Sequence, residues 1–363
     1  MTITWRQALT WRLRRHFLLD PRGGQAVAVV RRLCGVQAQL PSAARLAVGV
    51  RQQAPSPGGR DFDAAVADGR LIRTWAMRGT LHLLTADHAA DLLALLAVAR
   101  TWERGSWQRT FADAATMTRL ADAVPAALDG PPLTRDELVA AVAGQAHDGG
   151  LAEQLRSGWS TLLKPLAWQG LLCQGPSVGN RVTFTRPGLC SPGWPGLSDP
   201  DAAAARVVRA YLGAYGPATP EAFDQWLLRG ATRRADLRRW FAELGDDAVR
   251  VDVEGRPAYL LAEHADDVAA TPRSDAVHLL PAFDQYVLGP GTGDPVVVPP
   301  AHRGQVSRAG GWIAPVLLVE GRVAGTWETT DGQVRVDPFP GAPAADPRGL
   351  RRELARLTAL LAS

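Results

Sequence analysis

The sequence predicts an α+β protein made of three tandem winged-helix units and a β-rich C-terminal region. Three observations support this fold class. Residues 126–198 have the pattern helix, helix, hairpin, which is the outline of a winged helix. Residues 199–272 repeat that order, and residues 1–85 contain a more divergent version of it. After Pro272 the pattern changes to short strands. We expect four regions: 1–125, 126–198, 199–272 and 273–363.

The first region begins with two segments of helical periodicity, at residues 5–20 and 25–36. Because proline disfavours helical backbone at the preceding residue, Pro41 should end the second helix near Gln37 to Gln39. The later elements expected in this region are helices at 61–69 and 86–103, with strands at 71–75 and 79–84 between them.

Turn and cap residues delimit the next two units. The Gly130-Pro131-Pro132 break precedes Thr134 and Glu137, a capping-box pair that opens a helix at 135–143. The other elements expected in the second unit are a helix at 152–168 and a hairpin of 170–173 and 181–185 around a turn at 176–180. For the third unit they are helices at 201–215, from Thr219 and at 234–244, and a hairpin of 249–253 and 257–261 around a Glu254-Gly255 turn.

The C-terminal region is predicted to be mainly strand. Its last segment, residues 347–362, is an exception because its leucines recur on one face of a helix. The expected strands are 278–280, 295–298, 311–320, 322–327 and 333–336.

Charge and composition indicate a globular cytoplasmic protein. The formal net charge is +4, and Lys164 is the only lysine among 40 basic residues. Three scattered cysteines without C-x-x-C spacing are typical of reduced thiols. The N-terminus lacks the apolar core of a signal peptide, and the longest apolar run, Leu92 to Ala99, is too short to span a bilayer.

Several common enzyme motifs are missing. No P-loop is present, and the glycine-rich run at 289–293 leads into a predicted strand where a dinucleotide fingerprint needs a helix. The histidines show no zinc-ligand spacing, and G-x-S-x-G is absent. We therefore expect no metal and no cofactor. Tandem winged helices point to DNA, but these patterns leave a DNA-binding regulator and a DNA-modifying enzyme equally open.

Three motifs narrow that choice. They are Val-Gln-Ala-Gln at 36–39, Trp-Ala-Met-Arg-Gly-Thr-Leu-His at 75–82, and Pro-Ala-Phe-Asp-Gln-Tyr-Val-Leu-Gly at 281–289. With Arg303 and the segment 316–327, they follow the order and spacing of a known family. The chain resembles the winged-helix bacterial DNA glycosylases of the AlkZ type over nearly its whole length.

The resemblance implies a C-shaped scaffold whose concave, positive face grips duplex DNA. It also implies that Gln37 and Gln39 are the catalytic residues, in the two-glutamine version of the family motif. That version is associated with release of bulky N7-alkylated purines, with unhooking of interstrand crosslinks, and with self-resistance to a DNA-alkylating natural product. The implied protein is a monomer that works on the nucleoid.

The residues themselves are compatible with this role. Residues i and i+2 lie on one face of an extended segment but about 200° apart on a helix, so Pro41 favours convergence of the two amides. The simpler alternative is that Gln37 and Gln39 only cap a helix end. With Lys164 as the sole side-chain amine, we expect a monofunctional glycosylase without Schiff-base chemistry.

Other residues support weaker predictions. Arg303 and Arg308 flank a glycine- and serine-containing stretch that either reaches into a DNA groove or is a solvated surface, and Arg181 lies on the predicted wing of the second unit. We expect these arginines to contact DNA. His82 and Asp284 are expected to be buried hydrogen-bonding partners that support the fold. The alternatives to a glycosylase are a non-catalytic regulator and a drug-sequestering protein.

Overall fold

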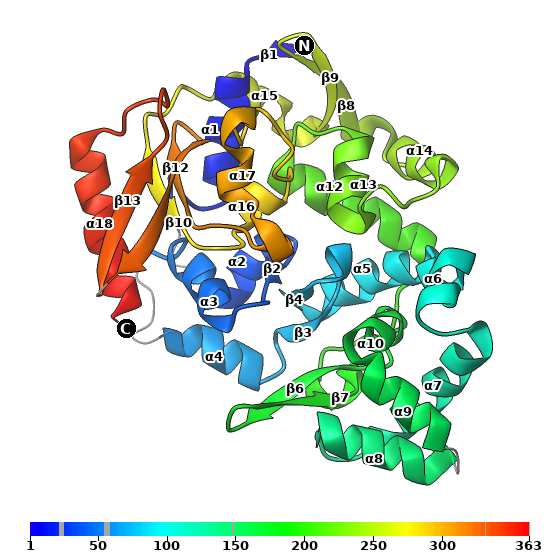
Figure 1. Cartoon of the computed structure of the whole chain (residues 1–363). Coiled ribbons are helices and arrows are strands. Elements are labelled where there is room, and N and C mark those ends of the chain that lie inside the picture. Colours follow the sequence, from blue (N-terminus) through cyan, green and yellow to red (C-terminus); the bar gives the residue numbers. More distant parts are fainter. Residues whose placement is uncertain (22–24, 54–58, 147–148, 331, 363) are drawn as a thin grey trace.

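The computed structural model describes residues 1–21, 25–53, 59–146, 149–330 and 332–362. It confirms the α+β class, with three winged-helix units and a β-rich C-terminal region (Figure 1). In Figure 1 the C-terminal region lies at the upper left and the third unit at the upper right, most of the first unit lies below the C-terminal region, and the second unit extends to the lower right. Within the described ranges, no helix is long and apolar enough to cross a membrane.

The first unit contains the segment with the two glutamines. Its first helix is fixed by a capping box, in which Thr4 Oγ1 accepts from the Gln7 amide and the Thr4 amide donates to Gln7 Oε1. The elements of this unit are β1 (Thr2–Ile3), α1 (Trp5–Arg15), α2 (Ala26–Arg32), β2 (Val36–Gln37), α3 (Pro41–Gly49), α4 (Arg60–Ala67), β3 (Ile72–Trp75) and β4 (Leu81–Leu84). Helices α5 (Ala86–Val98), α6 (Gly105–Thr110) and α7 (Ala114–Ala127) lead to the second unit.

The end of α2 differs from the sequence prediction. The helix stops at Arg32, because Cys34 and Gly35 adopt left-handed backbone with φ of 53° and 105°. A Cβ at Gly35 would lie 2.5 Å from a methyl carbon of Leu84, so glycine permits this close approach. The chain therefore enters the sheet as β2 well before Pro41.

Pro41 begins a helix that the sequence analysis missed. It occupies the first turn of α3, where proline is favoured because no amide hydrogen is needed there. Leu40 is extended, with φ −113° and ψ 113°, as expected of the residue before proline. Proline thus fixes the extended backbone after the glutamines while starting the next helix, and the sequence pattern shows only the first effect.

In the second unit the elements are β5 (Leu133–Thr134), α8 (Arg135–Ala146), α9 (Gly149–Ser157), α10 (Trp159–Trp168), β6 (Cys173–Val178) and β7 (Arg181–Thr185). Glu137 accepts hydrogen bonds from the Thr134 amide and hydroxyl at 2.7 Å, as the capping pair predicted. The expected helix at 152–168 is instead two helices separated by Gly158. The turn expected at 176–180 is present but shorter than predicted. Strand β6 continues to Val178, and Gly179, with φ 60°, and Asn180 form a two-residue turn.

One antiparallel sheet joins the first two units. Its strand order is β2-β4-β3-β6-β7-β5, and the strands of the two units pair at Arg73 and Gln174. Ile72 and Leu84 on one face pack against α5 and α12 (Pro200–Tyr215). Leu83, on the other face, packs with the helices of the first unit. The sheet crosses the expected boundary at residue 125, and the three boundaries between the four regions stay predictions.

The third unit has the expected helix–helix–hairpin order. After α11 (Pro187–Cys190) and α12 come α13 (Pro220–Leu228), α14 (Arg234–Ala242), β8 (Ala248–Val253), β9 (Arg256–Leu261) and α15 (Ala265–Ala269). Strand β1 from the chain start adds to β8 in parallel, so the N-terminus is tied to the third unit.

The C-terminal region is built on a four-stranded antiparallel sheet of β10 (Val277–Leu280), β11 (Val316–Val319), β12 (Arg322–Thr330) and β13 (Gln333–Pro338), with α16 (Gln285–Leu288), α17 (Arg303–Val306) and α18 (Pro347–Leu361). The strand predicted at 295–298 is wrong. These residues form a turn in which Asp294 accepts hydrogen bonds from the amides of Val296 and Val298 at 2.8 and 2.9 Å. The strand predicted from residue 311 begins only at Val316.

Candidate active site

Strand β2 positions the first of the two glutamines. Gln37 pairs with His82 of β4, and the next amide, of Ala38, continues the ladder by donating to the Leu81 carbonyl at 2.7 Å. Because the backbone is extended here, alternation places Gln37 and Gln39 on one side and Ala38 on the other. The helix end expected at this point was wrong, but the extended geometry that convergence requires is present.

The two glutamines differ in exposure. Gln37 is 6% exposed, and its Oε1 accepts from Arg78 Nη2 at 3.4 Å. Gln39 is exposed, and its Oε1 accepts from the Leu81 amide at 3.4 Å. Both hydrogen bonds are long. Arg78 lies in the connection between β3 and β4, and Leu81 is the first residue of β4. Each carboxamide is therefore held by a weak bond that a better partner can replace.

Gln37 lies on the wall of a cavity of about 850 Å³ between the first unit, the third unit and the C-terminal region. Aromatic side chains of α12, Tyr211 and Tyr215, form part of its floor. Its charged lining residues are mainly basic: Arg12, Arg78, Arg229, Arg256 and Arg303, against Glu221 and Asp294. Such an excess of arginine favours binding of a polyanion such as the phosphate backbone of DNA.

Arg78 lies within the motif at 75–82, but its place at the site was not predicted from the sequence. It follows β3 in left-handed backbone, with φ 57°, and its guanidinium donates to the Trp226 carbonyl at 3.0 Å and to Gln37. Burial lowers its pKa to about 10, so it remains charged at neutral pH. The only sign of it in the sequence is its place directly before Gly79 within the motif at 75–82.

His82 and Asp284 are both buried, as expected. Burial, followed by the nearby Arg78 charge, lowers the pKa of His82 to about 3, so its ring is neutral, with Nδ1 3.0 Å from the Thr80 carbonyl. Asp284 forms a fully buried bidentate ion pair with Arg51 at 2.7 and 2.8 Å and caps α16 through the Tyr286 amide. Asp284 does not line the cavity.

The three arginines predicted to contact DNA do not lie together. Arg303, at the start of α17, lines the cavity with Gln37. Arg308 is exposed in a tight loop, which is closed by a hydrogen bond from the Arg308 backbone amide to the Trp312 carbonyl at 2.8 Å. It does not line the cavity. Arg181 is exposed on β7 in the second unit, also away from the cavity.

Lys164 lies closer to the site than its sequence position suggested. A Cβ built on Gly79 would be 3.9 Å from Lys164 Nζ, so the amine sits against the turn that carries Arg78. Burial, followed by the charge of Arg229, lowers its pKa. Lys164 does not line the cavity. Across the described ranges, no group of three or more histidine, cysteine or acidic residues is placed to bind a metal ion.

Tandem winged-helix units around an arginine-lined cavity, with the carboxamide of Gln37 at its wall, are typical of a protein that binds DNA. Comparison with known proteins is more specific. Residues 30–360 match the family described as DNA glycosylase AlkZ-like, and the chain belongs to this family of DNA glycosylases, as its motifs predicted.

A curated relative and a solved structure, both from Streptomyces sahachiroi, define the relationship. The interstrand DNA cross-link repair glycosylase of Streptomyces sahachiroi is 47% identical over 361 residues, which cover 98% of this chain and 96% of the relative. The solved structure of Streptomyces sahachiroi DNA glycosylase AlkZ has a TM-score of 0.95 and 46% identity, over 99% of this chain and 97% of that one. The whole fold, and not one domain of it, is therefore shared.

Proposed function

We propose that the protein hydrolyses the N-glycosidic bond of N7-alkylated purines in duplex DNA, including bulky adducts and interstrand crosslinks left by a DNA-alkylating natural product. The observation that carries this proposal is the placement of Gln37 on the wall of an arginine-lined cavity, with Gln39 beside it on the same side of an extended segment. The crosslink-repair name of the 47% identical relative supports the substrate class.

Hydrolysis of an N7-alkylated purine can be assisted by two neutral amides, because its leaving group needs no strong acid. An N7-alkylated purine is cationic, so when the C1′–N9 bond breaks its electron pair neutralises the leaving base. Water then adds to C1′ and loses its proton to solvent. The carboxamide oxygens of Gln37 and Gln39 can each accept a hydrogen bond from that water and hold it in line with C1′. Orientation of this kind is worth several kcal/mol, or roughly 10³-fold in rate.

In this reaction Arg78 is a positioning residue. Its guanidinium holds Gln37 Oε1 and is itself fixed to the Trp226 carbonyl, so it links the glutamine to the third unit. We further propose that Arg303 neutralises a phosphate at the cavity mouth, and that Arg181 and Arg308 contact phosphates farther along the duplex. The protein acts as a monomer in this proposal.

The product is an abasic site with an intact backbone. A bifunctional glycosylase needs an amine that reaches C1′, and Lys164 packs against Gly79 outside the cavity lining. Borohydride treatment during turnover tests this point because it traps a Schiff base as a covalent adduct. We expect no trapped adduct and no strand break before heating, with Lys164→Arg indistinguishable from wild type. A wild-type adduct that Lys164→Arg abolishes would refute the monofunctional mechanism.

The rival function is a regulator that binds DNA without reacting. The two functions are separated by incubating the purified protein with a duplex containing one 7-methylguanine, and with a duplex crosslinked through purine N7 atoms. We expect free modified base from the first and unhooked strands from the second. Tight binding without release from either duplex would refute the proposed function in favour of the regulator.

A further inference from the structure

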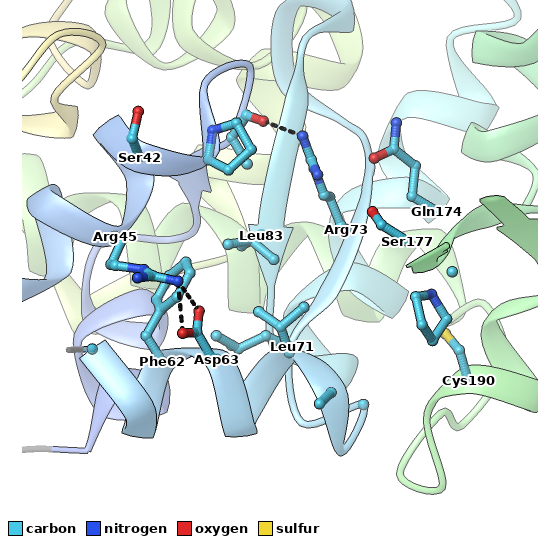
Figure 2. A pocket seen from close by; sticks show the side chains of 18 of the residues that line it. Ser42, Arg45, Phe62, Asp63, Leu71, Arg73, Leu83, Gln174, Ser177 and Cys190 are labelled. Carbon is cyan, nitrogen blue, oxygen red and sulfur yellow. Dashed lines mark hydrogen bonds and ion pairs between the residues drawn. The ribbon is translucent and has the colours of Figure 1, made fainter. Parts of the chain in front are cut away.

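A second cavity lies on the opposite side of β2 from the catalytic glutamines. It has a volume of about 1180 Å³ and is lined by α3 and α4 of the first unit and by β6 of the second (Figure 2). Ala38, between the two glutamines, faces this second cavity, whereas Gln37 faces the first. The two cavities are thus separated by the sheet.

The walls of the second cavity are largely apolar. Phe62 of α4, Leu71 before β3 and Leu83 of β4 line it, and Figure 2 shows them clustered below the polar residues at its upper edge. Its four charged lining residues balance, as two arginines and two aspartates, and Arg45 and Asp63 are paired with each other at 2.5 Å. The arginine-rich catalytic cavity differs in this respect. A cavity of this size without net charge fits a neutral, drug-sized organic molecule better than a nucleic acid.

Two buried polar atoms of residues that line the second cavity lack partners among the described residues. The Gln174 side chain is only 9% exposed, yet its Oε1 has no hydrogen bond to any described residue. The Nε of Arg73, the cross-strand neighbour of Gln174, is also buried without a partner. Figure 2 shows both side chains at the same edge of the cavity. Leaving a buried acceptor and donor unpaired is costly, so a molecule that pairs with both atoms would be stabilised here.

We propose that this second cavity is a binding site for a neutral, mainly aromatic organic molecule with an N–H or O–H donor for Gln174 Oε1 beside an acceptor for Arg73 Nε. The aromatic body packs against Phe62 and Leu83. Arg73 also donates to the Ala38 carbonyl at 2.9 Å through Nη2. The ligand therefore contacts a guanidinium that fixes the backbone between the catalytic glutamines. This site is independent of whether the protein is catalytic.

The test uses N-phenyl-1-naphthylamine, a neutral aromatic amine whose fluorescence rises in apolar surroundings and whose N–H can donate to Gln174. We expect saturable binding of one probe per protein. Gln174→Leu should weaken binding about fivefold, the equivalent of one hydrogen bond. Val66→Trp, which places an indole in the cavity from α4, should abolish it.

Two matched controls locate the probe. Ala222→Trp fills the catalytic cavity instead and should leave probe affinity unchanged, as should an excess of unmodified duplex DNA. Val182→Trp, on an exposed part of β7, controls for the added indole. Thermal unfolding confirms that each variant is folded. The proposal is overturned if the probe does not bind saturably, if folded Val66→Trp binds it normally, or if DNA or Ala222→Trp removes it.

Discussion

Replacing Asp284 by asparagine tests whether the buried ion pair supports the fold or the reaction. Asp284 and Arg51 have side chains that are 0% exposed, and the pair joins the first unit to the C-terminal region. Asparagine keeps the shape and can still cap α16, but it leaves the Arg51 guanidinium buried without a counter-charge. Breaking such a pair costs about 3–5 kcal/mol of the free energy of unfolding, a large part of a typical total of about 5–15 kcal/mol.

The assay is urea unfolding followed by tryptophan fluorescence. Asp337→Asn is the matched control, because its ion pair with Arg335 has side chains that are 48% and 69% exposed and should contribute less than about 1 kcal/mol. Adding Arg51→Met to Asp284→Asn should restore part of the lost stability, since no buried charge then remains.

Base release per folded molecule separates the two roles of Asp284. Since Asp284 lies outside the cavity lining, the release rate should stay within about threefold of wild type once the fraction of folded protein is accounted for. Asp284→Asn that is as stable as wild type would refute the electrostatic argument. A folded variant that loses release by a factor of 100 would show that Asp284 takes part in the reaction.

Three further outcomes are expected. Burial lowers the pKa of His82 and His278 to about 3 and that of His16 well below 6.5, so these histidines take up protons on unfolding below pH 6.5. The free energy of unfolding should therefore fall between pH 7 and 5, by up to about 2 kcal/mol per histidine. Equal urea midpoints at the two pH values would contradict this. The single-turnover release rate should be flat from pH 6 to 9, because glutamine does not titrate and His82 stays neutral; a rise with an apparent pKa of about 6–7 would instead identify a general base. Arg303→Ala should weaken duplex binding and reduce the slope of log affinity against log salt concentration by about one ion, whereas Arg335→Ala on β13 should change neither. Equal slopes for the two variants would show that Arg303 does not contact DNA.

Local chemistry was readable from the sequence where one residue type determines the structure. Thr134 with Glu137 gave a helix start, and the Glu254-Gly255 turn gave the β8–β9 hairpin. The structural effect of Pro41 was ambiguous, because proline disfavours helical backbone at the preceding residue but is favoured in the first turn of a helix. The early end of α2 depends on Gly35 meeting Leu84, a tertiary contact that no local pattern encodes.

The candidate site was predictable only in part. Gln37 and Gln39 were found because their motif resembles that of a family, and the extended backbone before Pro41 made their convergence reasonable. The cavity itself is assembled from distant segments, such as Arg78, Arg229 and Arg303, which sequence spacing does not bring together. The pairing of Arg73 with Gln174, which joins two units and forms the edge of the second cavity, is equally non-local.

The central claim is that Gln37 and Gln39 orient the attacking water. The most direct measurement is the single-turnover release of 7-methylguanine from duplex DNA by Gln37→Ala and Gln39→Ala, with Gln333→Ala on β13 as the control and duplex affinity measured in parallel. The proposed mechanism predicts at least about a 100-fold slower release for the two site variants at nearly unchanged affinity, and no effect in the control. Wild-type release rates in both site variants would contradict it.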